Sequence, residues 1–148
     1  MATPSSPLGC TNFKLRQLTR RVSQHYDHHL ALAGLKTTQY SLLSHIAKLG
    51  PLTPGELARR MTLDASTLTR NLQPLVAAGW VVVGEGVNAR SRLLTLTEAG
   101  REVRQTAQRH WKNAQLELNG LLGPAMVAEL HGLLDQALAA FEPETSDE

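Results

Sequence analysis

The stretch from Ala65 to Trp80 combines hydroxyl, amide and guanidinium side chains and contains no acidic residue. Hydroxyl groups suit phosphate oxygens, a guanidinium pairs with guanine, and side-chain amides pair with adenine. A helix face that is only solvated would usually alternate its charges, so this composition favours DNA contact over an ordinary polar face. The candidate DNA-binding residues are Ser66, Thr67, Thr69, Arg70, Asn71 and Gln73.

Two further arginines, Arg90 and Arg92, stand two positions apart in a turn-like stretch. On an extended backbone, residues at this spacing leave on the same face, with Ser91 on the other. Arginine suits the narrow minor groove of A·T-rich DNA, where the potential is more negative. We therefore add Arg90 and Arg92 to the candidate DNA contacts, although an exposed hairpin with no ligand can also carry two arginines.

A capping box marks the first of two helices that must position the polar stretch. Thr53 can cap a helix that has Pro54 at its first position and Glu56 at its third. This combination satisfies two backbone N–H groups reciprocally and adds the proline that helix starts prefer. The spacing predicts a short helix that ends near Met61.

Asp64 begins the second helix, which carries the polar stretch. Its carboxylate can accept a backbone N–H from Ser66 or Thr67, and Gly79 permits the left-handed close. Because only Thr62–Leu63 separates the two helices, they must cross at a large angle, which is helix-turn-helix geometry. One side of this second helix is apolar and should pack against the domain: Leu68, Leu72 and Leu75.

A β-hairpin is predicted directly after this pair of helices. Residues 80–83 and 93–96 are apolar or β-branched, and the segment between them is glycine-rich and charged. A helix-turn-helix followed by a hairpin is a winged helix, here about 36–96. The predicted fold class is mainly α with a small β-hairpin wing (α+β), and the second helix should enter the major groove.

Amphipathic helices flank the winged helix on both sides. Apolar residues recur every three or four positions over about 11–33, and helices over 97–141 repeat this period around Gly123-Pro124. The helices over 97–141 carry more apolar surface than one small domain can cover, which usually marks an interface. Intramolecular packing is the alternative, but two-fold DNA requires a two-fold protein, so we expect a homodimer.

The charge of the chain is uneven. Residues 1–110 hold 14 Lys and Arg against 6 Asp and Glu, whereas residues 111–148 hold one Lys against seven acids. The first part can meet a polyanion and the second would be repelled by one. We expect one domain over 10–141, between a disordered N-terminus at 1–9 and an acidic tail at 142–148.

Several classes of protein are disfavoured by what the sequence lacks. A single cysteine excludes an internal disulfide framework and a cysteine-rich zinc site. No apolar run reaches the roughly 20 residues of a membrane span, and no secretion signal is recognisable, so we expect a cytoplasmic protein. There is no phosphate-binding glycine loop, G-x-S-x-G or H-E-x-x-H motif, so we expect neither an enzyme nor a cofactor.

From Leu35 to Arg101 the sequence resembles the multiple antibiotic resistance regulator (MarR) family. The resemblance is carried by L-x-x-x-Q-Y-x-L-L, by L-A-x-x-M-x-L-D-x-S-T-L-T-R and by L-x-x-x-G-W before the hairpin. The arginine pair at the hairpin and the L-T-E-A-G-R run into the long helix complete it. Terminal helices around a central winged helix are also typical of the family.

The resemblance implies a cytoplasmic homodimer that represses transcription from pseudo-palindromic operators. By position, the family's major-groove and phosphate contacts fall on Ser66, Thr67, Thr69, Arg70 and Gln73, and its wing arginine on Arg90. The family often has an aspartate two residues before that arginine, where this chain has Asn88. An amide can still form a hydrogen bond with the arginine, but it braces the arginine more weakly than a carboxylate does.

Three kinds of switch are open. The resemblance implies a small, often aromatic or phenolic, effector between the dimerisation helices and the winged helix. A second possibility is peroxide sensing through Cys10, where the helix dipole favours a thiolate but no tyrosine stands nearby. A third is metal binding by His25, His28 and His29, but no acid or cysteine cluster completes that set, so we expect no metal site. The candidate effector residues are Tyr26, His28, His29, His45 and Trp111.

A winged helix that contacts only other proteins is the competing class of function. Such a module needs neither an acid-free polar helix face nor arginines on the hairpin. Salt separates the two, because DNA binding weakens steeply with ionic strength through counterion release and an apolar protein contact does not.

Overall fold

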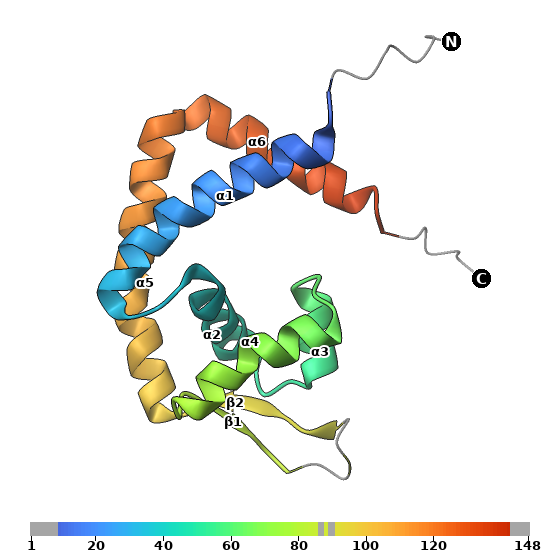
Figure 1. The fold of residues 1–148 in the computed structure, drawn as a ribbon, viewed down its shortest axis with the longest axis vertical. Coiled ribbons are helices and arrows are strands. Elements are labelled where there is room, and N and C mark those ends of the chain that lie inside the picture. Colours follow the sequence, from blue (N-terminus) through green and yellow to red (C-terminus); the bar gives the residue numbers. More distant parts are fainter. Residues whose placement is uncertain (1–8, 86–87, 89–90, 143–148) are drawn as a thin grey trace, which may run out of the picture.

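The computed structural model describes residues 9–85, 88 and 91–142 of the chain, and they form a mainly helical protein with one two-stranded hairpin (Figure 1). Of the expected termini at 1–9 and 142–148, residues 1–8 and 143–148 lie outside the described residues. The fold class is the one predicted. The elements are α1 (Thr11–Leu30), the 3₁₀ turn η1 (Ala31–Ala33), α2 (Thr37–Leu49), α3 (Pro54–Arg60), α4 (Ala65–Ala77), β1 (Val81–Val83), β2 (Leu94–Leu96), α5 (Glu98–Leu122) and α6 (Pro124–Ala139).

The core lies between α2, α4 and the hairpin. Leu43 and Ile46 of α2 are almost fully buried, as are Leu75 of α4 and Leu94 of β2. The apolar face predicted for α4 is confirmed, since Leu68, Leu72 and Leu75 are all buried.

The hairpin is antiparallel, with Val81 opposite Leu96 and Val83 opposite Leu94. Leu52 adds a bridge on the other side of Leu94, whose N–H donates to the Leu52 carbonyl at 2.8 Å. The sequence did not indicate this bridge, because one residue shows no alternation. It fixes the start of α3 against the hairpin.

Gly50 ends α2 in extended backbone, with φ at −72°, and so does not provide the left-handed close that is common after helices. A β-carbon at this position would lie 2.5 Å from the carbonyl oxygen of Ile46 and 3.3 Å from that of Leu94. Glycine is needed here for close approach of the backbone.

The long helix α5 runs along one side of the molecule, with α1 and α6 toward its far end and the winged helix toward its beginning (Figure 1). α6 has no buried residue. Among its large apolar side chains, Leu133 is 64% exposed and Leu138 is 60% exposed. No helix in the described ranges is long and apolar enough to span a bilayer.

Candidate nucleic-acid interface

The turn between α3 and α4 is built from local hydrogen bonds that the sequence indicated. Thr53 Oγ1 accepts the N–H of Glu56 at 3.2 Å, and the Glu56 carboxylate accepts the N–H of Thr53 at 2.9 Å. The helix ends at Arg60 with Met61 as its C-cap, so the predicted end near Met61 is confirmed. Thr62 then adopts a left-handed φ of 54°, which turns the chain sharply into α4.

Asp64 caps α4. Its Oδ1 accepts the N–H of Thr67 at 2.7 Å and the hydroxyl of Ser66 at 2.8 Å. The hydrogen bond from the Thr67 backbone, followed by the one from the Ser66 hydroxyl, lowers the pKa of Asp64 to about 2. The carboxylate is therefore charged at neutral pH and holds the beginning of α4 in place.

The outer face of α4 is polar and exposed. Ser66, Arg70 and Gln73 follow one another at four- and three-residue spacing, opposite the buried leucines, and all three are exposed. Thr69 is also exposed and its hydroxyl donates to the Ala65 carbonyl at 2.9 Å. Thr67 is half-buried, with its Oγ1 3.5 Å from Arg70 Nη2.

Asn71 is placed differently from the other five residues. It is half-buried and lines a hollow of about 390 Å³ together with Asp27 and Thr37. Asp27 in turn accepts the backbone N–H and the hydroxyl of Thr37, both at 2.7 Å. Asn71 therefore faces α1 and α2 across this hollow and lies beside the exposed face of α4.

The structure describes only part of the hairpin tip. Arg90 lies outside the described residues. That Arg90 and Arg92 leave the hairpin on one face therefore stays a prediction. Arg92 is exposed. It lies two residues before β2 and is not part of the strand. Asn88 Oδ1 accepts the N–H of Ser91 at 3.1 Å, and Ser91 Oγ accepts the N–H of Asn88 at 3.0 Å. The amide of Asn88 thus helps to close the turn that precedes Arg92.

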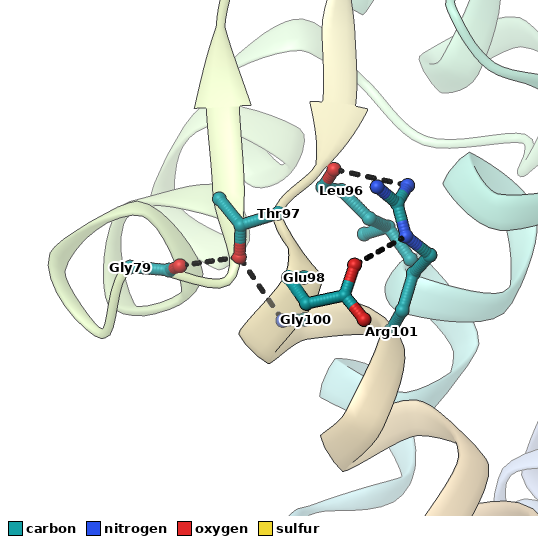
Figure 2. Close-up of polar contacts among 6 residues, drawn as sticks. All are labelled: Gly79, Leu96, Thr97, Glu98, Gly100 and Arg101. Atoms are coloured by element: carbon teal, nitrogen blue, oxygen red, sulfur yellow. Dashed lines mark hydrogen bonds and ion pairs between the residues drawn. The ribbon is translucent and has the colours of Figure 1, made fainter.

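The end of α4 is tied to the beginning of α5 (Figure 2). Gly79 closes α4 with φ at 78°, and the N–H of Trp80 reaches back to the Leu75 carbonyl at 3.0 Å. Thr97 then caps α5 by accepting the N–H of Gly100, while its hydroxyl donates to the Gly79 carbonyl. Arg101 lies beside this junction, with its Nε 3.6 Å from Oε2 of Glu98.

A cavity of about 450 Å³ lies between α1, α2 and α5. It contains three of the five candidate effector residues, Tyr26, His45 and Trp111. Trp111 stacks near Tyr40 with 6.2 Å between ring centres. Burial raises the pKa of Tyr26, whose hydroxyl donates to Gln115. His28 and His29 do not line this cavity: His28 is exposed, and His29 pairs with Glu117.

Two polar atoms at this cavity have no partner among the described residues. Ser44 Oγ and Arg104 Nε are both buried and make no hydrogen bond there. Both residues line the cavity, and Arg104 also lines a neighbouring one of about 530 Å³. Sequence reasoning missed this pair, because Ser44 and Arg104 belong to different helices and neither carries a local motif. A buried guanidinium nitrogen without a partner is costly and suits an anionic or hydrogen-bonding guest.

Cys10 is exposed and caps α1. Its Sγ accepts the N–H of Phe13 at 3.4 Å, and α1 begins at Thr11, as predicted.

The chain is similar in sequence to known transcriptional regulators. A family model described as MarR family matches residues 33–91. The multiple antibiotic resistance protein MarR of Salmonella typhimurium is 31% identical over 134 residues, which are 89% of this chain and 91% of that protein. The HTH-type transcriptional regulator YwoH of Bacillus subtilis is 29% identical over 85 residues, 57% of this chain and 62% of that protein.

The fold also matches solved structures. The M. tuberculosis transcriptional regulator MosR, in complex with DNA, has a TM-score of 0.75 and 33% identity, over 90% of this chain and 100% of that one. A mutant of MarR from E. coli, complexed with operator DNA, has a TM-score of 0.76 and 25% identity, over 86% and 92% of the two chains. YwoH and MosR are named as transcriptional regulators, which is consistent with the expectation that this chain is not an enzyme.

Proposed function

The chain belongs to the MarR family of transcriptional regulators, and on this premise we propose that it binds double-stranded DNA as a homodimer. In this proposal the dimer represses transcription from pseudo-palindromic operators and is released by a small aromatic effector. The observation that carries the proposal is the exposed, acid-free outer face of α4 within the winged helix.

The geometry of α4 supports major-groove contact. Three buried leucines anchor the helix, so Ser66, Arg70 and Gln73 are presented together on its opposite side. Arg70 is the single cation of this face and can pair with a guanine edge, while Gln73 suits adenine. Ser66, Thr67 and Thr69 are suited to phosphate oxygens. Asn71 is half-buried beside this face, so it would contact DNA only at the edge of the proposed interface.

The hairpin supplies a second contact in this proposal. Arg92 is exposed next to β2, and Asn88 closes the turn through Ser91. We assign Arg92, together with Arg90, to the minor groove or the adjacent phosphates. The similarity to MosR, whose structure contains DNA, supports this placement of a winged helix on a duplex.

The terminal helices support the homodimer. Large apolar side chains are exposed along α1, α5 and α6, and a groove of about 280 Å³ between the three helices is mostly apolar in its lining residues. Monomeric proteins rarely leave so much contiguous apolar surface open. The exposed side chains are Phe13, Leu15, Leu18, Leu116, Leu121, Met126, Leu133, Leu134, Leu138 and Phe141.

The cavity between α1, α2 and α5 supports a small aromatic effector. Its size falls within the range of about 300–1,000 Å³ that is usual for ligand sites. Tyr40 and Trp111 offer ring faces, while Arg104 Nε and Ser44 Oγ lack partners among the described residues. An aromatic compound with a carboxylate or phenolate could stack on these rings and form hydrogen bonds with the two polar atoms. Because the cavity joins α2 to α1 and α5, a guest there can alter how the two winged helices are spaced.

Cys10 provides a second candidate switch. It is the one cysteine of the chain and is exposed where α1 begins, so oxidation at this thiol would add bulk at the proposed dimer surface. Peroxide treatment of the wild type and of Cys10→Ser separates this switch from the effector. Release from DNA in the wild type alone would support it.

The proposal is tested by enriching random duplexes on the purified protein and measuring binding of the enriched sequence over a range of salt. A two-fold symmetric sequence, and affinity that falls steeply with salt, are expected. Binding that ignores salt, or no selected sequence, would instead favour a module for protein contacts.

A further inference from the structure

We propose that His25, His29 and Glu117 form a binding site for one divalent transition-metal ion of the zinc type. His25 and His29 are four residues apart on α1, and Glu117 comes from α5. Each offers one ligand atom, and these three atoms lie within 4.8 Å of one another. The sequence showed only a group of histidines without an acid, and it is the packing of α1 on α5 that supplies the carboxylate.

The three side chains already face one another. His29 Nε2 lies 2.7 Å from a carboxylate oxygen of Glu117, and the rings of His25 and His29 are 5.1 Å apart between centres. The ligands of a tetrahedral zinc ion, at about 2.0–2.2 Å from the metal, stand roughly 3.5 Å from one another. A side-chain adjustment of about 1 Å would therefore bring this set to bonding distance, while both helices stay in place.

The chemistry of the set suits zinc. Two imidazoles and one carboxylate are a common protein ligand set for this ion, which takes water as the fourth ligand. Purely oxygen ligands would favour magnesium or calcium, and thiolates are absent from this group. On binding, the metal takes the place of the hydrogen bond between His29 Nε2 and Glu117, so both atoms bond the metal. The His29 ring then stays neutral and carries its one proton on Nδ1.

The surroundings allow both entry and orientation. The side chain of Glu117 is 63% exposed and that of His29 is 14% exposed, so an ion can enter from the solvent on the Glu117 side. His25 Nε2 lies 2.9 Å from the Ala114 carbonyl. A proton on Nε2 would satisfy this carbonyl and leave Nδ1 as the ligand atom, the arrangement that commonly orients metal-bound histidines.

The site is separate from the proposed effector cavity and from α4. None of its three residues lines that cavity. The ion would join α1 to α5 and so add stability to the packing of these two helices. The proposal therefore does not depend on DNA binding, and the test measures the metal itself.

The test uses the full chain without a histidine tag, stripped with a chelator and titrated with Zn²⁺ by calorimetry and against a chromogenic chelator. We expect one ion per chain in the wild type and at least tenfold weaker binding in Glu117→Gln and His29→Gln. The matched control is His28→Gln, because His28 is exposed on the same helix but outside the three-residue set. Titration with Co²⁺ should give the intense visible absorption of a four-coordinate ion in the wild type and in His28→Gln, but not in Glu117→Gln.

Thermal unfolding provides a second readout. Zn²⁺ should raise the Tm of the wild type and of His28→Gln, and leave that of Glu117→Gln unchanged. Since Glu117 is largely exposed, its variant should fold even if a histidine variant does not. The proposal is overturned if the wild type binds no Zn²⁺, if Glu117→Gln binds as tightly as the wild type, or if His28→Gln loses as much affinity as Glu117→Gln.

Discussion

The hydroxyl of Thr97 donates a hydrogen bond to the carbonyl of Gly79, at 2.6 Å, across the junction between α4 and α5. The same oxygen accepts the N–H of Gly100 at 3.0 Å, and the backbone N–H of Thr97 donates to Trp80. One residue therefore caps the long helix and fixes it to the end of α4. A change in the direction of α5 would be passed to the polar face of α4 through this connection.

Replacement of Thr97 by alanine should lower the free energy of unfolding by about 1–2 kcal/mol. The loss combines an N-cap with a hydrogen bond to a carbonyl that would be left without its partner. Chemical denaturation measures it. Thr97→Ser keeps the hydroxyl and should stay close to the wild type; an equal loss in both variants would contradict the capping role.

Gly100 and Gly120 both belong to α5 and should respond in opposite ways to alanine. A β-carbon on Gly100 would overlap the carbonyl of Trp80, which is backbone and cannot swing away, whereas Gly120 has nothing within 4 Å. We expect Gly100→Ala to cost about 1–3 kcal/mol of stability. Gly120→Ala should be neutral or stabilise by up to about 1 kcal/mol. Similar midpoints for the two variants in denaturant would show that α5 does not approach Trp80 as described.

The charge of Asp64 should stabilise the protein at neutral pH and cease to do so in acid. Its pKa is lowered from 3.8 to about 2 in the folded chain, first by the Thr67 N–H and then by the Ser66 hydroxyl. The contribution is therefore complete above about pH 4 and is lost as the pH falls toward 2. Unfolding of the wild type and of Asp64→Asn across this range tests it. The wild type should be the more stable at pH 7, and the difference should shrink below pH 4; a constant difference would rule out this origin.

Binding of an aromatic acid should depend on Arg104. We expect Arg104→Gln to weaken benzoate binding more than tenfold, since a hydrogen bond to a charged group is worth roughly 1.5–3 kcal/mol. The quenching of Trp111 fluorescence, with Trp80→Phe as background, reports the binding. Benzyl alcohol has the ring without the charge, so it should bind weakly, and with the same affinity, to the wild type and to Arg104→Gln. Arg101→Gln is the control, because Arg101 does not line this cavity; unchanged benzoate affinity in Arg104→Gln would remove the effector assignment.

The features predicted from sequence are those with local causes. Thr53, Asp64 and Thr97 each cap a helix through an N–H three residues ahead, so their signals lie within one turn of chain. The leucine period of α4 is equally local and equally visible. For this reason the order of the elements and the exposed face of α4 could be predicted in advance.

The features that sequence reasoning missed depend on distant segments. The bridge of Leu52 to Leu94 and the cavity that Ser44 and Arg104 both line arise only after the helices have packed. Glu117 lies 88 residues from His29 along the chain. No pattern of spacing could have placed that carboxylate beside the histidines of α1. The half-buried position of Asn71, beside the exposed face of α4, also depends on the packing of other helices and could not be predicted from spacing.

The central claim, that the outer face of α4 binds DNA, is tested most directly by comparing Arg70→Ala with Arg16→Ala on the duplex that the wild type selects. Both variants lose one exposed guanidinium, but Arg16 belongs to α1 and not to α4 or the hairpin, the two proposed DNA-contacting elements. Arg70→Ala should lose about 1–3 kcal/mol of affinity for the selected duplex and much less for random DNA. Arg16→Ala should bind as the wild type does. Equal affinities for Arg70→Ala and the wild type, on both duplexes, would contradict the account.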